Sequence, residues 1–498
     1  METYHFQLNK DTHKISPVCF QMPENCTGIS LQYDLEVPYT MLVLLMIKDE
    51  KGRLRFQKQL SYSNPIISLS NDPKTSTLGA IPGELGQGQW TIEAVYNQEY
   101  GKHFDKDLIE FKIDLSFEAS SILEAIGGPI WVDKDFNYSF FDQDKIYQKG
   151  KAWYKGDFHT HTQLSDGKEL IPTVTEKVLG EGLDFYYATE HNLLHTGWQE
   201  TELMVLPGME MTTNFGHANV FGMTKRPESL DAIINDSGQE KVLAAIDKFI
   251  KECNDNDWYF SINHPFLYQW KWQFDELSLD KIRSLEIIND PTYELEPKAR
   301  GKLANQQAVD LSDFFWSEGY RICAIGGSDS HLLKDECYPT ATTPSVPGDP
   351  ATWVLMDDLT PNNLKKGLAA CHTYVTRFCQ LDSQFTTDDN QVIVYGDKVA
   401  DDCQELHFDI CIEMEKKPYL FYKLNGQEVA LDLEKIDQDQ YRAQGKISFS
   451  QESYDWIRFG ANTQDGDFRF YGNPITRGEK TTSIKTFGQA KEKLGLES

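Results

Sequence analysis

Two histidines, His159 and His161, stand one residue apart in the segment GDFHTHTQLSDG, which closes on Asp166 in a predicted turn. In an extended strand, residues i and i+2 project from the same face, so both imidazoles would point toward one place. Asp329 and His331 form a second pair with this spacing, after the apolar run ICAIGG. Imidazoles and carboxylates are common ligands of transition metals, and the two pairs therefore indicate a metal site.

Further side chains of the same types follow other short apolar runs. Glu190 and His191 follow DFYYAT, Glu210 follows LMVLPGM, and His264 follows YFSIN. Taken singly, the Glu190-His191 pair could cap a helix and His264 could belong to an ordinary loop. At least five such residues occur in order along one stretch of chain, and a chance arrangement explains this poorly.

Three more residues keep an ordinary structural interpretation beside the functional one. Asp166 with its following glycine could form only a turn, and His195 and His217 are individually more often structural than ligands. Nitrogen and oxygen ligands suit zinc, manganese or iron(II), and the set contains no cysteine. The set exceeds the needs of one tetrahedral ion, which favours a multinuclear site with Glu210 as a bridge.

The chain from residue 151 onward alternates between short apolar runs and helical periods. Helical periodicity is clear in residues 171–183, 239–253 and 304–319. Strands that alternate with helices predict a largely parallel α/β unit. One polar ligand at the carboxyl end of each strand is the layout of an active site on a β/α barrel, where residues distant in sequence converge.

Strand-and-turn patterns predict β-rich regions on both sides of this unit. Residues 39–60 indicate a strand, a charged turn and a return strand, and residues 419–433 indicate a hairpin around Asn425-Gly426. We expect an N-terminal β-sandwich-like domain at 1–150, a metallohydrolase domain at 151–378, a C-terminal β-rich domain at 379–475, and a polar tail at 476–498 that is either loose or docked on the surface.

The composition, with 40% apolar and 25% charged residues, is that of an ordinary soluble globular protein. The 48 basic and 77 acidic residues give a formal net charge of −29, which argues against nucleic acid or an anionic membrane as a general partner. The longest apolar run, residues 40–47, is too short to cross a bilayer, and the first residues do not resemble a secretory signal. Nine scattered cysteines without CxxC spacing suggest reduced thiols, although disulfides stay possible, and we expect a cytoplasmic protein.

Several of these segments together resemble a known family. DFHTHTQLSDG, ATEHN, PGMEMTTNFGHANVFGM, INHP, SLEIIN and GGSDSH are similar to the successive motifs of the polymerase and histidinol phosphatase (PHP) superfamily, particularly its CehA/McbA-like branch. The resemblance covers about residues 151–378, and ACHTYVT and YGNPIT resemble the segment that ends the PHP unit and the closing strand of the branch. It implies an α/β fold, a distorted (β/α)7 barrel with two or three divalent metals, flanked here by all-β sandwich-like regions.

The resemblance also implies how the ligands would divide. By motif, they would be His159, His161, Glu210 and Asp329 on one ion, Glu210, His264 and His217 on a second, and Asp166, His191 and His331 on a third. One departure is visible, because the family usually has aspartate where this chain has Glu190. We therefore expect Glu190, with Asn192, to support the ligands from behind.

The reaction that these features predict is metal-dependent hydrolysis of a small phosphate monoester or diester through a metal-bridging hydroxide. His195 and His264 are candidates by type for the acid that protonates the leaving group. Lys168, Lys334 and Arg377 each stand next to a motif and could bind phosphate oxygens, although an ordinary solvated side chain explains each equally well. Two alternatives stay open: hydrolysis of a carbamate or carboxylic ester at the same site, and a non-catalytic carbohydrate- or protein-binding protein with a vestigial metal site.

Overall fold

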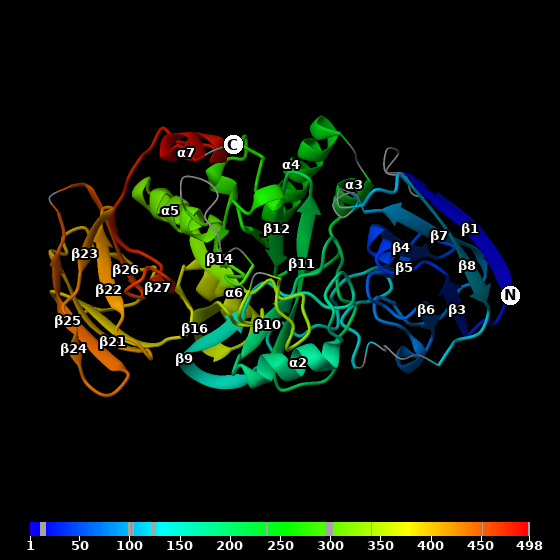
Figure 1. Ribbon diagram of the computed structural model, residues 1–498, viewed down its shortest axis with the longest axis horizontal. Helices are drawn as coiled ribbons and strands as arrows, with labels where there is room; N and C mark the ends of the chain where they lie inside the picture. The colour runs from blue at the N-terminus through cyan, green and yellow to red at the C-terminus, as the bar shows by residue number, and fades with distance from the viewer. Residues whose placement is uncertain are drawn as a thin grey trace.

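Strands dominate both ends of the chain, and an α/β region lies between them in the computed structural model (Figure 1). The structure describes residues 1–9, 16–97, 101, 104–121, 126, 128–235, 238–293, 302–339, 341–450 and 452–496. Within these residues, no helix has the length and apolar character needed to span a membrane.

The N-terminal region consists of two antiparallel sheets that share one apolar core. One sheet has the order β1-β8-β3-β6, with β1 Glu2–Asn9, β8 Leu108–Ser116, β3 Gly28–Tyr33 and β6 Ile66–Ser70. The other has the order β2-β7-β4-β5, with β2 Ser16–Met22, β7 Gly88–Tyr96, β4 Val43–Lys48 and β5 Leu54–Gln59. Phe6 and Ile113 from the first sheet and Trp90 from the second are buried in the same cluster. The pairing of β4 with β5 confirms the predicted strand, turn and return strand.

The central sheet continues without interruption into the C-terminal region. Its order is β15-β14-β13-β12-β11-β10-β9-β16-β17-β27-β26-β22-β23. The bounds of the first nine are β15 Cys323–Gly327, β14 Ser284–Asn289, β13 Tyr259–Ile262, β12 Gly216–Phe221, β11 Met204–Thr213, β10 Phe185–Ala188, β9 Gln148–Asp157, β16 Ala351–Leu359 and β17 Thr373–Thr376. The remaining strands are β27 Phe468–Gly472, β26 Tyr454–Asn462, β22 Tyr419–Leu424 and β23 Gln427–Ala430. Off this order, β28 Ile475–Gly478 pairs with β26, and β20 Lys398–Val399 pairs with β28.

This sheet is mixed, whereas the sequence pattern predicts a largely parallel one. β9, β10 and β11 run parallel, as do β13, β14 and β15, but β12 is antiparallel to both of its neighbours. The reason is a tight connection between β11 and β12, since a hairpin of two residues can join only antiparallel strands. Gly216 at this turn has φ +118° and packs against Trp272, where a Cβ atom would lie 2.7 Å from the Trp272 Cα atom.

The segments that follow β9 and β15 meet at one edge of the sheet. Thr160 and Ser330 form an isolated parallel bridge, and the amide of Asp329 donates to the carbonyl oxygen of His159 over 2.8 Å. No continuous ladder between β15 and β9 is present among the described strands, so a closed seven-stranded barrel stays a prediction. The bridge is sufficient to bring the two predicted ligand pairs together.

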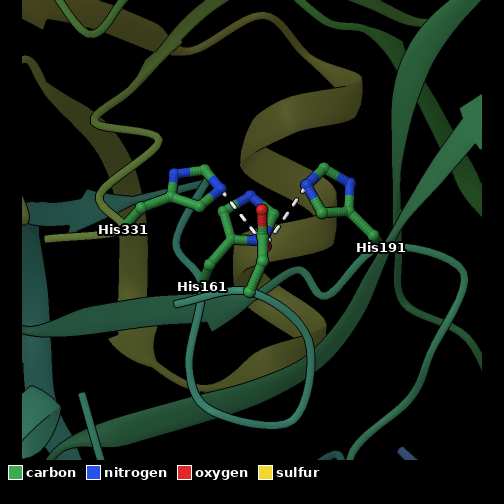
Figure 2. A group of neighbouring side chains, drawn as sticks. His161, His191 and His331 are labelled. Atoms are coloured by element: carbon green, nitrogen blue, oxygen red, sulfur yellow. Dashed lines mark ion pairs between the residues drawn. The ribbon is translucent and has the colours of Figure 1, made fainter. Parts of the chain in front are cut away.

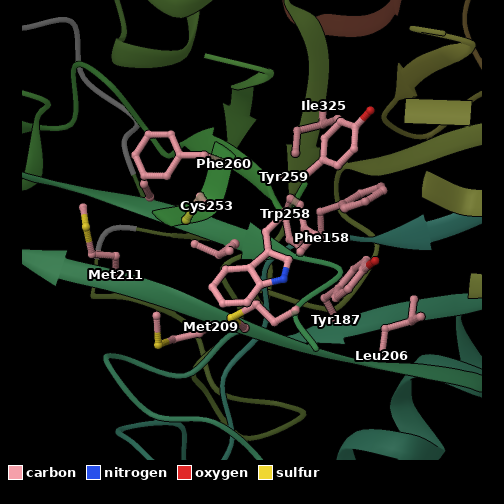
Figure 3. Close-up of a cluster of buried hydrophobic side chains, with 14 of the residues drawn as sticks. Phe158, Tyr187, Leu206, Met209, Met211, Cys253, Trp258, Tyr259, Phe260 and Ile325 are labelled. Carbon is pink, nitrogen blue, oxygen red and sulfur yellow. The ribbon is translucent and has the colours of Figure 1, made fainter. Parts of the chain in front are cut away.

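Helices accompany this sheet, and α2 Ile171–Gly180, α4 Gln239–Asp255 and α5 Ala304–Ser317 confirm the three predicted helical periods. The structure adds α3 Leu230–Asn235, α6 Pro361–Ala369 and the short 3-10 helices η3 Tyr268–Trp270 and η4 Leu279–Lys281, which the sequence pattern did not predict. Two further 3-10 helices, η1 Tyr39–Leu42 and η2 Pro73–Thr75, belong to the N-terminal sheets. Along α4, Ile246, Phe249 and Cys253 are buried, as the 3.6-residue period requires. Figure 3 shows the centre of this core, where Trp258 lies among apolar side chains that include Met209.

The C-terminal strands pack a second sheet against the extended central one. Its order is β19-β18-β21-β25-β24, with β19 Val392–Ile393, β18 Gln380–Thr387, β21 Glu405–Glu413, β25 Gln440–Ser448 and β24 Glu434–Lys435. The predicted hairpin at Asn425-Gly426 is confirmed, and both residues have positive φ, as this tight turn requires. The last helix, α7 Phe487–Leu494, packs against α5 through the fully buried Phe487.

Candidate metal centre

The predicted ligands lie at or just beyond the ends of six strands of the central sheet. His159 and His161 follow β9, His191 follows β10, Glu210 lies in β11, His217 in β12, His264 follows β13, and Asp329 and His331 follow β15. Each strand is held in register by its neighbours, so the backbone fixes where each side chain starts. The structure brings all of these residues to one place.

Glu210 lies at the centre of this group and is fully buried. Five imidazoles approach its carboxylate, with nitrogen-to-oxygen distances of 2.8 Å for His191, 3.2 Å for His217, 3.3 Å for His159, 3.4 Å for His264 and 3.6 Å for His161. The amide Nδ2 of Asn263 also donates to Glu210 Oε1 over 2.9 Å. A carboxylate in contact with so many imidazoles is suited to bridge two cations.

Two further carboxylates complete the cluster. Asp329 Oδ1 lies 3.0 Å from His161 Nε2 and 3.2 Å from His159 Nε2. Asp166 Oδ1 lies 3.4 Å from Nε2 of both His191 and His331. Figure 2 shows the rings of His161, His191 and His331 converging, with dashed lines from His191 and His331 to the carboxylate between them.

The donor atoms fall into four overlapping groups in which all atoms lie within 4.8 Å of one another. The groups are His161, Asp166, His191 and His331; His159, His161 and Glu210; His159, His264 and Asp329; and His191, Glu210 and His217. All nine predicted ligands therefore belong to at least one group. Their nitrogen and oxygen atoms form the donor set that zinc, manganese or iron would accept.

Several donor atoms in the cluster are buried and point at one another without forming a hydrogen bond of good geometry. These atoms are His159 Nε2, His161 Nε2 and Asp329 Oδ1, and Asp329 Oδ1 lies within 3.2 Å of both nitrogens. Such groups are costly to bury unless something else satisfies them. A cation among these three atoms would accept their lone pairs, so the residues present fit a metal.

The charges of the cluster also suit a cation. Burial by itself would raise the pKa values of Glu210 and Asp329, but the surrounding histidines, with His159 the largest contributor, hold both well below the usual range. Burial, together with the nearby His331 and His191, lowers the pKa of His161 to about 3. The carboxylates are therefore ionised and His161 is neutral. The same carboxylates raise the pKa values of His159, His191 and His331 despite their burial, so a cation would displace the protons of these three imidazoles as it binds.

Glu286 is a buried residue of this site that the sequence interpretation did not name as a candidate. Its Oε1 atom lies 3.0 Å from His159 Nδ1, and its Oε2 atom accepts the backbone amide of His264 over 2.9 Å and the Asn289 amide over 3.2 Å. This contact turns His159 so that Nε2 faces Glu210 and Asp329, the arrangement in which a carboxylate orients a metal-binding histidine. The available signal was a single acidic residue inside the apolar strand SLEIIN.

Glu190 lies behind the cluster and organises the loop that carries Asp166. Its carboxylate accepts the amides of Thr162 over 3.0 Å and Ser165 over 3.2 Å, and His195 Nε2 lies 2.7 Å from Oε1. His195 is fully buried and is not among the residues that line the cavity above the cluster. Its position favours a supporting role over that of a proton donor.

Asn192 also acts on the backbone beside the cluster. Its side-chain amide donates to the carbonyl oxygen of Thr212 over 2.9 Å, and its carbonyl oxygen accepts the amide of Thr212 over 2.9 Å. The hydroxyl of Thr212 lies 2.6 Å from His191 Nδ1. Asn192 therefore joins the loop after β10 to β11 and holds His191 near Glu210.

A cavity of about 250 Å³ opens above the cluster. Asp166, His191, His217, His264, Asp329 and His331 line its base. Of the predicted phosphate-binding residues, only Lys168 lines this cavity, and its ammonium group pairs with Glu336. Lys334 is exposed at the surface, and Arg377 pairs with Asp349 beside a different hollow. The structure thus brings one of the three predicted cations to the site.

Comparison with protein-family models gave no match, and comparison with curated proteins gave none either. Among solved structures, a two-domain protein from Bacteroides vulgatus, described as containing a predicted PHP-like metal-dependent phosphoesterase, aligns over 69% of this chain and 99% of its own, with 15% identity and a TM-score of 0.34. A protein from Bifidobacterium adolescentis, provisionally described as a metal-dependent phosphoesterase, aligns over 38% of this chain and 92% of its own, with 14% identity and a TM-score of 0.24. At these values, neither likeness decides the fold or the function of this chain.

Proposed function

We propose that this protein is a metal-dependent phosphoesterase. The observation that supports it is the buried carboxylate of Glu210 with five imidazoles within 3.6 Å, of which His191, His217 and His264 also line an open cavity. Ion pairs that serve only stability do not need five histidines around one carboxylate. A cluster of this composition beside a substrate-sized hollow is the usual setting of hydrolytic metal chemistry.

The four ligand groups indicate how the chain would hold two or three ions. Divalent cations bound there would supply an activated water and would neutralise the charge on the oxygen atoms of the ester. In the reaction, a bond forms between a water oxygen and phosphorus, the bond from phosphorus to the leaving oxygen breaks, and one proton passes to the leaving alkoxide. Glu286, Glu190 and Asn192 keep the ligands in place.

Two of the residues predicted to bind substrate or to protonate the leaving group line the cavity. Lys168 would bind an oxygen of the ester, and its ion pair with Glu336 offsets part of its charge. His264 lines the cavity with 5% of its surface exposed and also belongs to one of the ligand groups. Of the two predicted proton donors, only His264 lines the cavity, so its position favours it over His195.

The proposal extends to points of finer detail. It includes a closed (β/α)7 barrel of the PHP type, membership of the CehA/McbA-like branch, zinc, manganese or iron as the metal, a small phosphorylated substrate, and a place in the cytoplasm. The motif resemblance supports the first two, the donor set supports the third, and the cavity of about 250 Å³ supports the fourth. The net charge of −29 fits a protein that does not bind nucleic acid.

A second candidate, hydrolysis of a carbamate or carboxylic ester, is favoured by one observation. The only lysine or arginine among the described residues that line the cavity is Lys168, and it is already paired with Glu336. A phosphate dianion gains from more cations than this, whereas a neutral ester does not need them. The ligand cluster serves either reaction, because both pass through a transition state with negative charge on oxygen.

The deciding experiment compares substrates on the same metal-loaded protein. After chelation and reloading with zinc, manganese or iron(II), we expect turnover of an aryl phosphate or a bis-aryl phosphate, and loss of at least 100-fold in kcat for Glu210→Gln. Glu228→Gln, at an exposed surface pair with Lys225, is the matched control and should keep full activity. Turnover of an aryl carboxylic ester alone would refute the phosphoesterase. Fewer than one bound ion per chain, with no activity after reloading, would favour the binding protein.

A further inference from the structure

The wall of the cavity above the metal-type ligands is aromatic. Four partly exposed rings, from Tyr62, Trp270, Tyr293 and Tyr338, line it and are called the aromatic collar below. Leu267 and Leu332, both nearly buried, add apolar surface between these rings, as does Met41. Lys168, Asn289 and Asp290 also line the cavity, so beyond the ligands most, but not all, of its lining is aromatic or apolar.

Three rings of the aromatic collar support one another. The ring centroids of Trp270 and Tyr293 lie 5.6 Å apart at an interplanar angle of 59°, and those of Tyr293 and Tyr338 lie 4.9 Å apart at 81°. Partial burial raises the pKa of Tyr338, and the charge of Asp290, which accepts a hydrogen bond from Ser345 over 2.9 Å, raises it further. Rings held by one tilted and one edge-to-face contact present a fixed surface, which a planar partner can extend at little entropic cost.

The fourth ring comes from the N-terminal sandwich. The amide of Gln59, at the end of β5, donates to the carbonyl oxygen of Leu164 over 3.0 Å, and the Gln57 side chain donates to the carbonyl oxygen of Leu194 over 2.8 Å. These bonds fix the start of the segment that carries Tyr62 against loops of the metal centre. The Lys168 ammonium lies 5.5 Å from the centroid of the Tyr62 ring. The N-terminal region therefore supplies part of the wall.

Size and charge restrict what this wall can contact. A dry cavity of about 150 Å³ holds one benzene ring, so a cavity of about 250 Å³ has room for one ring and the ester group. Among the described lining residues, Lys168 is the only lysine or arginine, and its ammonium group already pairs with Glu336. A negatively charged ring would therefore find no further lysine or arginine among these residues, and an uncharged ring suits the aromatic collar best.

We propose that this site takes esters whose alcohol part is a single uncharged aromatic ring, bound by the aromatic collar. The inference rests on the proposed function, since it names the substrate class of the same site. The ring of the substrate lies against Trp270, Tyr293 and Tyr62, while its ester group reaches the ligands at the base. The aromatic collar thus selects the substrate, and the ligand cluster determines the reaction.

The test compares two phosphates of matched size and leaving-group basicity, benzyl phosphate and cyclohexylmethyl phosphate, by release of inorganic phosphate from the metal-loaded protein. An aromatic contact adds roughly 2- to 12-fold per ring, so we expect kcat/KM to favour benzyl phosphate by roughly tenfold or more. Trp270→Leu and Tyr62→Leu should each reduce this preference by about threefold or more without loss of bound metal. Phe140→Leu, which removes an aromatic side chain that is 67% exposed, should leave the preference unchanged.

Binding of benzylphosphonate and cyclohexylmethylphosphonate, which cannot be hydrolysed, separates this inference from the proposed function. If neither phosphate is turned over but benzylphosphonate binds more tightly, the phosphoesterase fails and the aromatic collar stands. Hydrolysis of both phosphates at equal kcat/KM, or equal binding of both phosphonates, would overturn the inference. If Trp270→Leu does not fold, Tyr62→Leu still tests the inference. Tyr62 lines the same cavity but comes from the N-terminal region, after β5.

Discussion

Replacing Glu286 by glutamine tests whether the position of His159 depends on a buried carboxylate. Both oxygens of Glu286 act as acceptors: Oε1 faces His159 Nδ1 at 3.0 Å, and Oε2 accepts from the His264 amide at 2.9 Å and from Asn289 at 3.2 Å. A glutamine has one oxygen and one NH2 group in these places. In either orientation of the glutamine amide, its NH2 group faces the His159 ring or the two donors from His264 and Asn289. At least one buried donor then loses its acceptor.

The magnitude follows from these contacts. A hydrogen bond to a charged group contributes about 1.5–3 kcal/mol, and a buried donor left unsatisfied costs about 1–3 kcal/mol. Loss of the carboxylate also removes the charge that orients the His159 imidazole, and such changes cost about 10- to 100-fold in metal affinity. We therefore expect Glu286→Gln to weaken metal binding by at least tenfold, with a moderate loss of stability.

Metal affinity is measured by competition with a chromophoric chelator, beside a thermal melt of the metal-free protein. Glu252→Gln is the matched control. The carboxylate of Glu252, in α4, also accepts two backbone amides, those of Glu228 and Ser229, but it belongs to none of the ligand groups. This variant should lower the Tm and leave metal affinity unchanged. The reasoning is refuted if Glu286→Gln destabilises the protein as the control does, yet binds metal within twofold of the original chain.

Three further perturbations follow from the structure. Gly327→Ala would place a Cβ atom 2.4 Å from the Cβ atom of His159 and 2.7 Å from Glu286 Oε1. We therefore expect the metal content to fall while the far-UV circular dichroism stays unchanged. Full metal content in this variant would contradict the prediction. Removal of metal by a chelator should lower the Tm of the central unit in calorimetry, because a ligand present at 100 times its Kd stabilises the folded state by about 2.7 kcal/mol. An unchanged Tm would argue against a metal site. Burial by itself would raise the pKa of Asp397, but its bond to His372, at 2.9 Å, and the bond from the Val394 amide hold this pKa below its usual value. The carboxylate therefore stabilises the fold above about pH 4, and this contribution is lost as the pH falls further. Asp397→Asn should accordingly lower the Tm at pH 7 and bring the two Tm values together at low pH; a constant difference across the pH range would refute this assignment.

Local sequence determined much of the ligand set. The spacing in HTH and DSH predicted two ligand pairs, and polar residues after apolar runs marked the ends of the strands. The structure places both pairs just beyond β9 and β15, and Asp329, with φ +50°, is not on the extended backbone that the spacing predicted. Three helices and two hairpins followed from apolar periods and from turn residues with positive φ. These features depend on a few neighbouring residues, so periodicity and turn chemistry were sufficient to predict them.

Other parts of the site depend on residues that are distant in the chain. Glu286 was missed because its partner His159 lies 127 positions away, and Tyr62 joins the cavity only because β5 docks on the loop that contains Leu164. Lys334 and Arg377 stand near motifs in sequence, yet one faces solvent and the other pairs with Asp349.

The sequence by itself determined which side chains could bind a cation and on which strand ends they stand, because side-chain chemistry and short-range spacing are local properties. Only the tertiary structure decided that five imidazoles share the carboxylate of Glu210, that Glu286 lies behind His159, and that aromatic rings from separate regions form one wall. The physical reason is that strand order and docking of the flanking sheets arise from burial of apolar surface across the whole chain, which no single segment encodes.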